Sequence, residues 1–249
     1  MATVLFRGRS GRWWLVVLAA LFLLPAAPAG AEPGPAVGAA GPGAQAAAAW
    51  GLPFLAVVRS VDPLTAADMT GVSWRPGCPV PLSDLRVVDM TFWGFDGHPH
   101  RGELVLHVDV AWDVVGVFRT LYDARFPIRR MERVDRYGAD DDASMAADNT
   151  SAFNCRPVTG STDRFSIHSY GKAIDINTIE NPYVSSDLGV LPPAGAAFTD
   201  RTDVRPGMVV AGDVVTRAFA RIGFAWGGDW DDPTDYQHFE TVDDPRPPA

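Results

Sequence analysis

Lysine is almost absent from this 249-residue chain, in which Lys172 is the only one. Positive charge is scarce as well, because 21 basic residues stand against 30 acidic ones and the net charge is −9. An acidic surface repels phosphate backbones and anionic lipid headgroups. We therefore expect neither nucleic acid nor an anionic membrane surface as a partner.

The chain also lacks an apolar run long enough to span a bilayer at its start. The run from Trp13 to Leu24 has twelve residues, whereas a spanning helix needs roughly 20. Arg7, Arg9 and Arg12 precede it, and Ala29-Gly30-Ala31 follows with the small-x-small form of a cleavage site. We predict a signal peptide over residues 1–31, cleaved after Ala31; the alternative is an uncleaved membrane anchor. Cleavage would leave 18 basic and 30 acidic residues, a net charge of −12.

Cysteine is scarce too, since only Cys78 and Cys155 occur and neither belongs to a Cys-x-x-Cys pair. That spacing argues against a cysteine-ligated metal. In an exported chain a disulfide is the better interpretation, and closing so long a loop would stabilise the fold by roughly 4 kcal/mol. A Gly-x-Ser-x-Gly motif is missing as well, so nothing supports catalysis by a serine or cysteine nucleophile.

The remaining sequence divides into a spacer and one domain. Residues 32–49 are rich in proline, glycine and alanine, which indicates a flexible linker. Residues 50–249 form the expected domain. Alternating hydrophobicity predicts strands, and helical spacing predicts helices. The predicted strands cover 85–95, 103–110, 128–134, 173–179 and 236–241, the helices cover 65–69, 113–125 and 213–222, and long loops cover 135–155 and 180–208. This order indicates an α+β fold with a mainly antiparallel sheet and flanking helices.

Two segments carry the chemistry. The first runs from Ser166 to Asn177 and contains His168 and Asp175; the second runs from Asp235 to Glu240 and contains His238. Asp175 stands between two isoleucines, where a buried charge is costly unless it is paired or bound to a cation. A glycine at position 171 permits a tight turn that brings His168 back beside Asp175. Two imidazoles and a carboxylate, with a free position for water, are the ligands of a hydrolytic zinc site.

The pattern Ser-x-His-x-x-Gly-x-Ala-x-Asp, followed by Gly-Gly-Asp-Trp and Asp-x-x-His-Phe-Glu, resembles the M15 family of zinc peptidases. That family includes D-alanyl-D-alanine carboxypeptidases, dipeptidases and L-alanyl-D-glutamate endopeptidases of bacterial cell walls, and its fold is related to hedgehog-type domains. The motifs cover residues 149–240. The resemblance implies one zinc ion per chain on His168, Asp175 and His238, with Asp235 as the general base that takes a proton from water. It also implies an arginine that polarises the scissile carbonyl.

Arg156 is our candidate for that arginine, with Arg129, Arg130 and Arg164 as competitors. Four further residues are candidate substrate contacts, each with a plain structural role as its alternative: Ser166, Tyr170, Trp226 and Trp230. The other histidines, at positions 98, 100 and 107, are expected to be structural. The acidic run 140–142 is expected to be a solvated loop rather than a calcium site.

Together these features predict an exported, zinc-dependent peptidase, either a carboxypeptidase or an endopeptidase, acting on peptidoglycan stem peptides. We expect a secreted, extracytoplasmic monomer with no membrane contact after signal cleavage. The alternative from another class is a zinc-containing binding module of the same fold that has lost turnover. The presence of Asp235 favours an enzyme. A purely structural secreted domain would leave both motifs unexplained.

Overall fold

The computed structural model describes residues 53–158, 161 and 164–243. The predicted signal peptide and spacer lie outside the described residues. Nineteen short elements form an α+β fold with antiparallel sheets, which confirms the predicted class. No described helix has the length and apolar character that crossing a bilayer requires.

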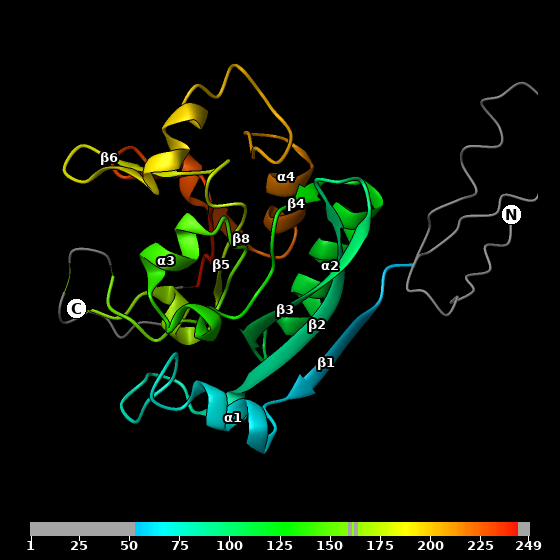
Figure 1. The fold of residues 1–249 in the computed structure, drawn as a ribbon, viewed down its shortest axis with the longest axis vertical. Coiled ribbons are helices and arrows are strands. Elements are labelled where there is room, and N and C mark those ends of the chain that lie inside the picture. Colours follow the sequence, from blue (N-terminus) through cyan, green and yellow to red (C-terminus); the bar gives the residue numbers. More distant parts are fainter. Residues whose placement is uncertain (1–52, 159–160, 162–163, 244–249) are drawn as a thin grey trace, which may run out of the picture. The chain divides into compact units, whose positions relative to one another are not determined.

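The first sheet is built around a long hairpin, β2 (Leu85–Gly94) and β3 (Pro99–His107), which is close to its predicted position. Strand β1 (Ala56–Ser60) pairs antiparallel with β2, and the short β4 (Pro127–Ile128) pairs with it in parallel. The prediction missed β1. Figure 1 shows α2 (Ala111–Asp123) lying along this sheet, and α1 (Pro63–Met69) follows β1. Helix α2 occurs where hydrophobic spacing predicts it, and α1 occurs where a short helix was expected.

The hairpin is buried on both faces. Val88 and Leu104 face one hydrophobic cluster, which continues through α2, whereas the neighbouring pair Val87 and Val105 faces a second cluster that contains Cys155. Because successive side chains of a strand point to opposite sides, one hairpin can serve both clusters. It therefore forms the rigid support against which the rest of the domain packs.

The second sheet has the order β5–β10–β8: β5 (Ala173–Asp175), β10 (His238–Thr241) and β8 (Phe224–Trp226). In Figure 1 the red strand β10 lies beside β5. Helix α4 (Val214–Ala220) begins at Asp213, whose carboxylate accepts a hydrogen bond from the Thr216 amide, and Phe219 of this helix stacks on Phe239. This packing joins the second sheet to the first cluster.

The third sheet has the order β7–β6–β9: β7 (Gly189–Leu191), β6 (Tyr183–Ser185) and β9 (Thr234–Asp235). The prediction of a loop over residues 180–208 is therefore wrong. It missed the hairpin of β6 and β7 and the 3₁₀ segment Pro193–Phe198. Strands β6 and β7 have three residues each, which are too few for an alternating pattern to stand out from the surrounding sequence.

The predicted strand over 128–134 is also wrong beyond Ile128. Ile128, Met131 and Val134 are buried and the residues between them are not, so burial recurs every third residue rather than every second, as a strand requires. The 3₁₀ segment Val134–Tyr137 begins there.

The neighbouring loop predicted over 135–155 instead contains helix α3 (Asp141–Ala146), which begins where Asp140 accepts a hydrogen bond from the Ala143 amide. Asp140 thus caps a helix, as this residue type commonly does, and the solvated-loop interpretation of 140–142 is corrected.

Two further strands are shorter than predicted. The strand predicted over 173–179 ends at Asp175, and Asn177 has a φ of 45°, a left-handed conformation that is incompatible with an extended strand and that Asn tolerates better than most residues. The strand predicted over 236–241 begins at His238, and Asp235 belongs to a separate strand.

Candidate functional site

A short 3₁₀ turn, Ile167–Tyr170, presents His168. The Ser166 side chain caps the turn by accepting a hydrogen bond from the His168 amide at 3.3 Å. Gly171 ends it with a φ of 66°, and a Cβ at that position would lie 2.7 Å from the His107 amide nitrogen. Only glycine satisfies both constraints, so the turn predicted from the sequence is confirmed.

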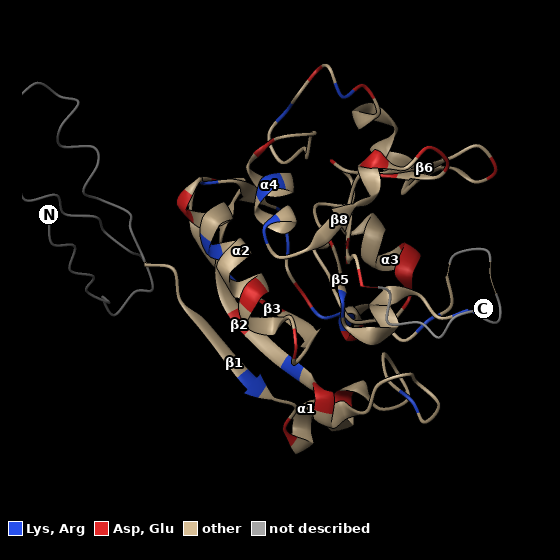
Figure 2. Ribbon diagram, turned by 180° about the vertical axis from the view of Figure 1, so that it is seen from behind, with Lys and Arg blue, Asp and Glu red and all other residues tan. Residues whose placement is uncertain are grey.

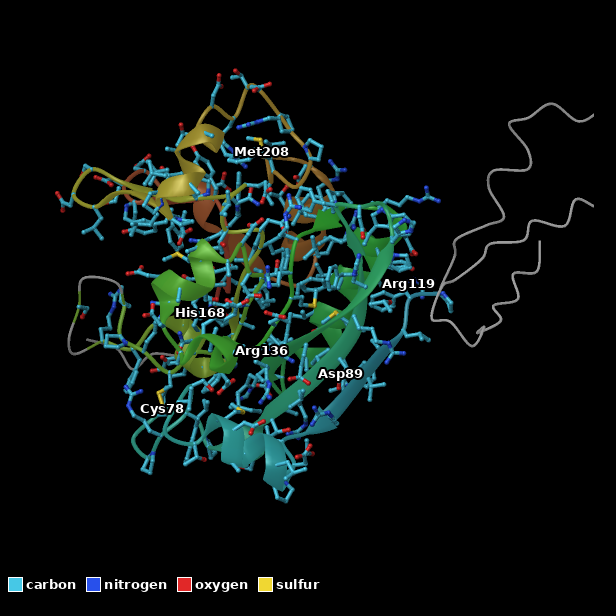
Figure 3. The ribbon with its side chains drawn as sticks, in the orientation of Figure 1. Cys78, Asp89, Arg119, Arg136, His168 and Met208 are labelled. Atoms are coloured by element: carbon cyan, nitrogen blue, oxygen red, sulfur yellow. A yellow bond between two sulfur atoms is a disulfide. The ribbon has the colours of Figure 1, made fainter. Side chains whose placement is uncertain are left out.

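The His168 ring is fixed in orientation. Its Nδ1 lies 2.6 Å from the Ala152 carbonyl oxygen, which can only accept a hydrogen bond, so Nδ1 carries the proton. Nε2 then faces the other two ligand candidates. Figure 3 shows His168 on the opposite side of the folded part from Arg119 of α2.

Asp175 and His238 are direct neighbours across the β5–β10 pair. The Asp175 carboxylate lies 3.0 Å from His238 Nδ1 and 3.2 Å from His168 Nε2, and those two ring nitrogens lie 3.2 Å apart. All three side chains are buried, and one ligand atom from each lies within 4.8 Å of the others. They are the one such group of three among the described residues. The structure thus brings together the three predicted ligands, although His168 and His238 are 70 residues apart in the chain.

The electrostatics of this group favour bound positive charge. Burial alone would raise the pKa of Asp175, but the adjacent His168 and His238 outweigh it and hold that pKa well below its usual range. Burial likewise opposes protonation of His238, yet hydrogen bonds to Asp175 and Glu240 raise its pKa to about 10. The group thus keeps a buried carboxylate ionised beside positive charge, and a buried carboxylate requires such a partner, either a protonated imidazole or a bound cation.

Glu240 orients His238 from the far side, with its Oε2 3.1 Å from His238 Nε2. A carboxylate on the second ring nitrogen fixes the tautomer and makes the first nitrogen a stronger ligand. In the sequence Glu240 was noted only as the last residue of the second motif. Its contact with the imidazole indicates an orienting role.

Asp235 lies in β9, opposite Tyr183 of β6. Its Oδ1 is buried and has no hydrogen-bond partner among the described residues. Burial, reinforced by the negative charge of Asp175, raises the pKa of Asp235 to about 7. A carboxyl group with such a pKa can both take and release a proton near neutrality.

These groups share one cavity of about 390 Å³. One part of its wall is polar and acidic, and apolar and aromatic side chains form another part. The lining includes Asp141, Asp142, Met145, Arg156, Arg164, Ser166, His168, Asp175, Tyr183, Leu191, Trp230, Asp235, Gln237, His238 and Glu240. A short peptide could therefore present a backbone carbonyl to the ligand group and side chains to the apolar wall.

Arg156 lines this cavity, and its Nη2 forms a 2.8 Å ion pair with Asp141 of α3. Arg164 also lines the cavity. The other two competitors lie elsewhere: Arg129 pairs with Asp148 and Glu180, and Arg130 donates to the Ala147 carbonyl. Arg156 and Arg164 therefore remain as candidates for the arginine that polarises the scissile carbonyl, and Arg156 is the more buried of the two.

The four candidate substrate contacts divide evenly. Ser166 and Trp230 line the cavity, and the Trp230 ring lies 5.4 Å from the His238 ring. Tyr170 instead packs in the second hydrophobic cluster. Trp226 packs in the first cluster and donates its indole hydrogen to the Tyr236 carbonyl. For Tyr170 and Trp226 the alternative, a plain structural role, therefore agrees with the structure.

The sequence reasoning overlooked several cavity residues, among them Met145, Tyr183 and Gln237. Gln237 stands inside the Asp-x-x-His motif and could have been included on that ground. Tyr183 could not, because its place follows from the pairing of β6 with β9, which no local pattern reveals.

The other histidines lie outside the ligand group. His100 Nε2 contacts Asp96 in the hairpin turn at 2.9 Å, and His107 Nδ1 lies 3.1 Å from Asp109. Both contacts are ordinary partners for an imidazole at a strand end. The structural interpretation of these two residues therefore agrees with the structure.

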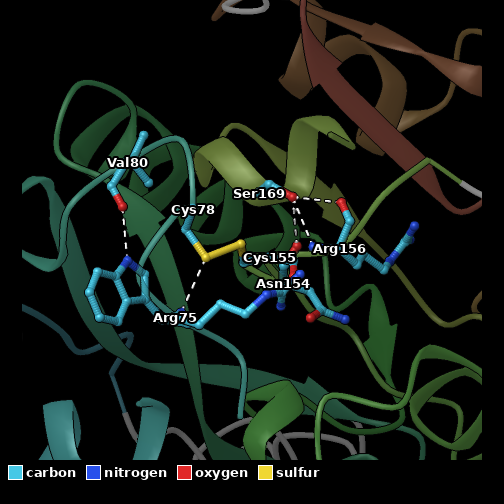
Figure 4. The surroundings of a disulfide bond; sticks show 8 residues. Arg75, Cys78, Val80, Asn154, Cys155, Arg156 and Ser169 are labelled. Carbon is cyan, nitrogen blue, oxygen red and sulfur yellow. Dashed lines mark hydrogen bonds between the residues drawn. A yellow bond between two sulfur atoms is a disulfide. The ribbon is translucent and has the colours of Figure 1, made fainter. Parts of the chain in front are cut away.

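The predicted disulfide is present between Cys78 and Cys155, and no free cysteine remains. Figure 4 shows that it lies beside the segment that carries Arg156. The bond thus ties the loop after α1 to the wall of the cavity.

A comparison with known proteins supports the resemblance. Residues 159–241 match the M15 peptidase family model described as D-alanyl-D-alanine carboxypeptidase. Searches of curated proteins and of solved structures gave no match. The matched segment contains His168, Asp175, Asp235 and His238, so the part of the chain that holds the candidate site is similar to the M15 family of peptidases.

Proposed function

We propose that this protein is an exported, zinc-dependent metallopeptidase that hydrolyses peptide bonds in peptidoglycan stem peptides, as a D-Ala-D-Ala carboxypeptidase or an L-Ala-D-Glu endopeptidase. One observation carries the proposal. The buried group of His168, Asp175 and His238 opens into the same cavity as Asp235, an acid with an unpaired, buried oxygen.

Zinc fits this donor set. Two imidazole nitrogens and one carboxylate match the ligands of hydrolytic zinc sites, and M15 peptidases use this metal. The orientation of His168 by a carbonyl and of His238 by Glu240 is the support that metal-binding imidazoles require. When bound, zinc acts as a Lewis acid that polarises a carbonyl and lowers the pKa of water from 15.7 to about 7.

The protein's own residues then divide the proton transfers and the charge. Asp235, with its pKa of about 7, takes a proton from the attacking water and returns it to the leaving amine. Arg156 lies in the cavity wall, where its guanidinium would stabilise the negative charge that develops on the carbonyl oxygen. Ser166 and Trp230 bound the space available to the substrate.

The substrate and the location follow from several independent features. The N-terminal apolar segment after three arginines and the disulfide suit an exported protein in an oxidising compartment. The family match suits a substrate from the cell wall.

Incubation with purified muropeptides tests the proposal. The protein loaded with one zinc per chain should release a defined fragment, identified by mass spectrometry, and a chelator should abolish the release until zinc is restored. Stoichiometric zinc without any product would contradict the enzyme and favour the non-catalytic binding module.

A further inference from the structure

Arg156 is held by its backbone as well as by its ion pair. On its N-terminal side, Cys155 is joined to Cys78, its amide donates to the Ser73 carbonyl at 3.0 Å, and its carbonyl accepts a hydrogen bond from Arg75 at 2.8 Å. Three contacts thus fix the residue before Arg156 to the loop after α1, whichever way the Arg156 side chain points.

The hydroxyl of Ser169 contacts the Arg156 backbone from the side of the ligand group, His168, Asp175 and His238. Ser169 Oγ accepts a hydrogen bond from the Arg156 amide at 2.9 Å and lies 2.8 Å from the Arg156 carbonyl oxygen and 3.2 Å from that of Asn154. Figure 4 shows the dashed contacts that meet at this side chain. Ser169 is fully buried, so water cannot replace these contacts.

Ser169 directly follows His168, so the same turn carries the ligand and the contact to Arg156. The two segments are linked a second time, because the Asn154 amide donates to the His168 carbonyl at 3.2 Å and the Ser166 amide donates to the Arg156 carbonyl at 3.0 Å. Ser169 is nevertheless the side chain that contacts both peptide groups of Arg156. Its hydroxyl is thus placed to set the distance between Arg156 and the ligand group.

We propose that Ser169 is a positioning residue, which acts through Arg156 and does not touch the substrate. This inference rests on the proposed function of Arg156. The hydroxyl holds the Arg156 backbone against the His168 turn, the disulfide holds it from the other side, and Asp141 directs the guanidinium into the cavity. Small displacements of a group that stabilises a transition state have large effects on rate.

Ser169→Ala tests the idea through a double-mutant cycle with Arg156→Ala. In the otherwise wild-type protein, Ser169→Ala should lower kcat/KM by about 10- to 100-fold, mainly through kcat, with zinc content unchanged. In the Arg156→Ala background the same change should alter kcat/KM by less than about twofold, because the residue through which Ser169 acts is gone. Equal losses in both backgrounds would overturn the proposal.

Ser73→Ala is the matched control. Ser73 is buried to the same degree, and its hydroxyl donates to Asp135 rather than to Arg156. Ser73→Ala should lower the unfolding free energy but leave kcat unchanged. This result should be the same with Arg156 present and in the Arg156→Ala background. A Ser73→Ala variant that reproduced the kinetic pattern of Ser169→Ala would reduce Ser169 to a packing role.

Hydrogen exchange provides a measurement that does not depend on turnover. The Arg156 amide should be protected in the wild type. Ser169→Ala should reduce that protection and leave the Asn154 carbonyl, 2.9 Å away, as the acceptor that remains to the amide, while the Cys155 amide, bonded to the Ser73 carbonyl, stays protected. Unchanged protection of the Arg156 amide would refute the positioning role whatever the activity. A wild type without peptidase activity would instead refute the proposed function.

Discussion

The hairpin region and the cavity region bury different kinds of side chain. In the hairpin region, residues 53–140, the buried polar side chains are the hydroxyls of Thr65, Ser73 and Thr91. In the cavity region, beyond residue 140, the described residues bury the ionisable groups Asp148, His168, Asp175, Glu180 and His238. In the hairpin region charges remain partly exposed, as in the pairs of Arg59 with Asp89 and Glu103.

This contrast separates stability from chemistry. Buried ionisable groups cost free energy unless they are paired, and even paired ones are poor sources of stability. The apolar hairpin and α2 supply the burial that offsets this cost. Figure 2 shows a basic position on β1 and acidic positions on α1 and α3, so charged residues occur in both regions. What differs is whether the charge is buried.

The largest effect should come from the ligands. His168→Ala and His238→Ala should each lose zinc and with it all measurable hydrolysis, because two remaining ligands hold the ion too weakly. Elemental analysis of the purified variants measures the metal content. His100→Ala, at the exposed start of β3, is the control and should keep one zinc per chain. Full zinc in both cavity variants would disprove the ligand assignment.

The next effect should come from Asp235. Asp235→Asn keeps the size and removes the base, so kcat should fall by about 10²–10⁴, with zinc content unchanged. Asp235→Glu should recover part of the rate. Asp142→Asn makes the same change elsewhere in the cavity lining and should leave kcat nearly unchanged. Single-turnover assays measure the rate of each variant. Loss of zinc in Asp235→Asn would instead show that Asp235 is a metal ligand.

Removal of the disulfide should cost less than loss of the metal but affect both regions. Because the cysteines have a sequence separation of 77, the double variant Cys78→Ala/Cys155→Ala should lose about 4 kcal/mol of unfolding free energy on the chain-entropy estimate. The double variant should also lose activity at urea concentrations below its unfolding midpoint, where it is still folded, because the disulfide holds the segment that carries Arg156. Urea titrations and assays at low urea measure the two losses. Full activity in the folded variant would show that the bond serves stability alone.

A smaller and pH-dependent effect should come from Glu180. Burial, followed by the adjacent Asp148, raises the pKa of Glu180 to about 7. The folded state then binds this proton more tightly than the unfolded chain. The resulting stability is fully present below the ordinary pKa of 4.5 and is lost as the pH rises through about 7.

Glu180→Gln should therefore match the wild type near pH 5 and exceed it in unfolding free energy by about 1–3 kcal/mol at pH 8. Denaturant titrations at the two pH values measure the difference. A Glu180→Gln variant less stable than the wild type at pH 8 would mean that Arg129 compensates the ionised acid.

The smallest effect should come from the hairpin region. Asp89→Asn removes one partner of Arg59, but both side chains are partly exposed and two further acids remain nearby. The unfolding free energy should change by less than about 1 kcal/mol, with no dependence on pH between 5 and 8. A larger change would place a second sensitive charge network outside the cavity region.

The sequence was informative where a local pattern carries the structure. Helices α2 and α4 and the β2–β3 hairpin have enough turns or alternations for their period to be recognised. The ligand candidates were accessible because two short motifs hold them, and Gly171 indicated the turn between them. The Cys78–Cys155 pairing needed only the cysteine count.

The remainder depends on contacts that no local pattern records. The β6–β9 pair brings Tyr183 to the cavity, and Arg129 is diverted from it by Asp148 and Glu180. Tyr170 and Trp226 stand beside the motif residues in sequence, yet their side chains point into the hydrophobic clusters. Proximity in the chain could not distinguish a wall of the cavity from the core behind it.

The disulfide also bears on which side chains can bind a metal. Thiolates are strong ligands for zinc, but Cys78 and Cys155 are joined to each other and no free cysteine remains. In the oxidised protein neither sulfur is a thiolate, so His168, Asp175 and His238 are left as the one group of three possible ligands among the described residues.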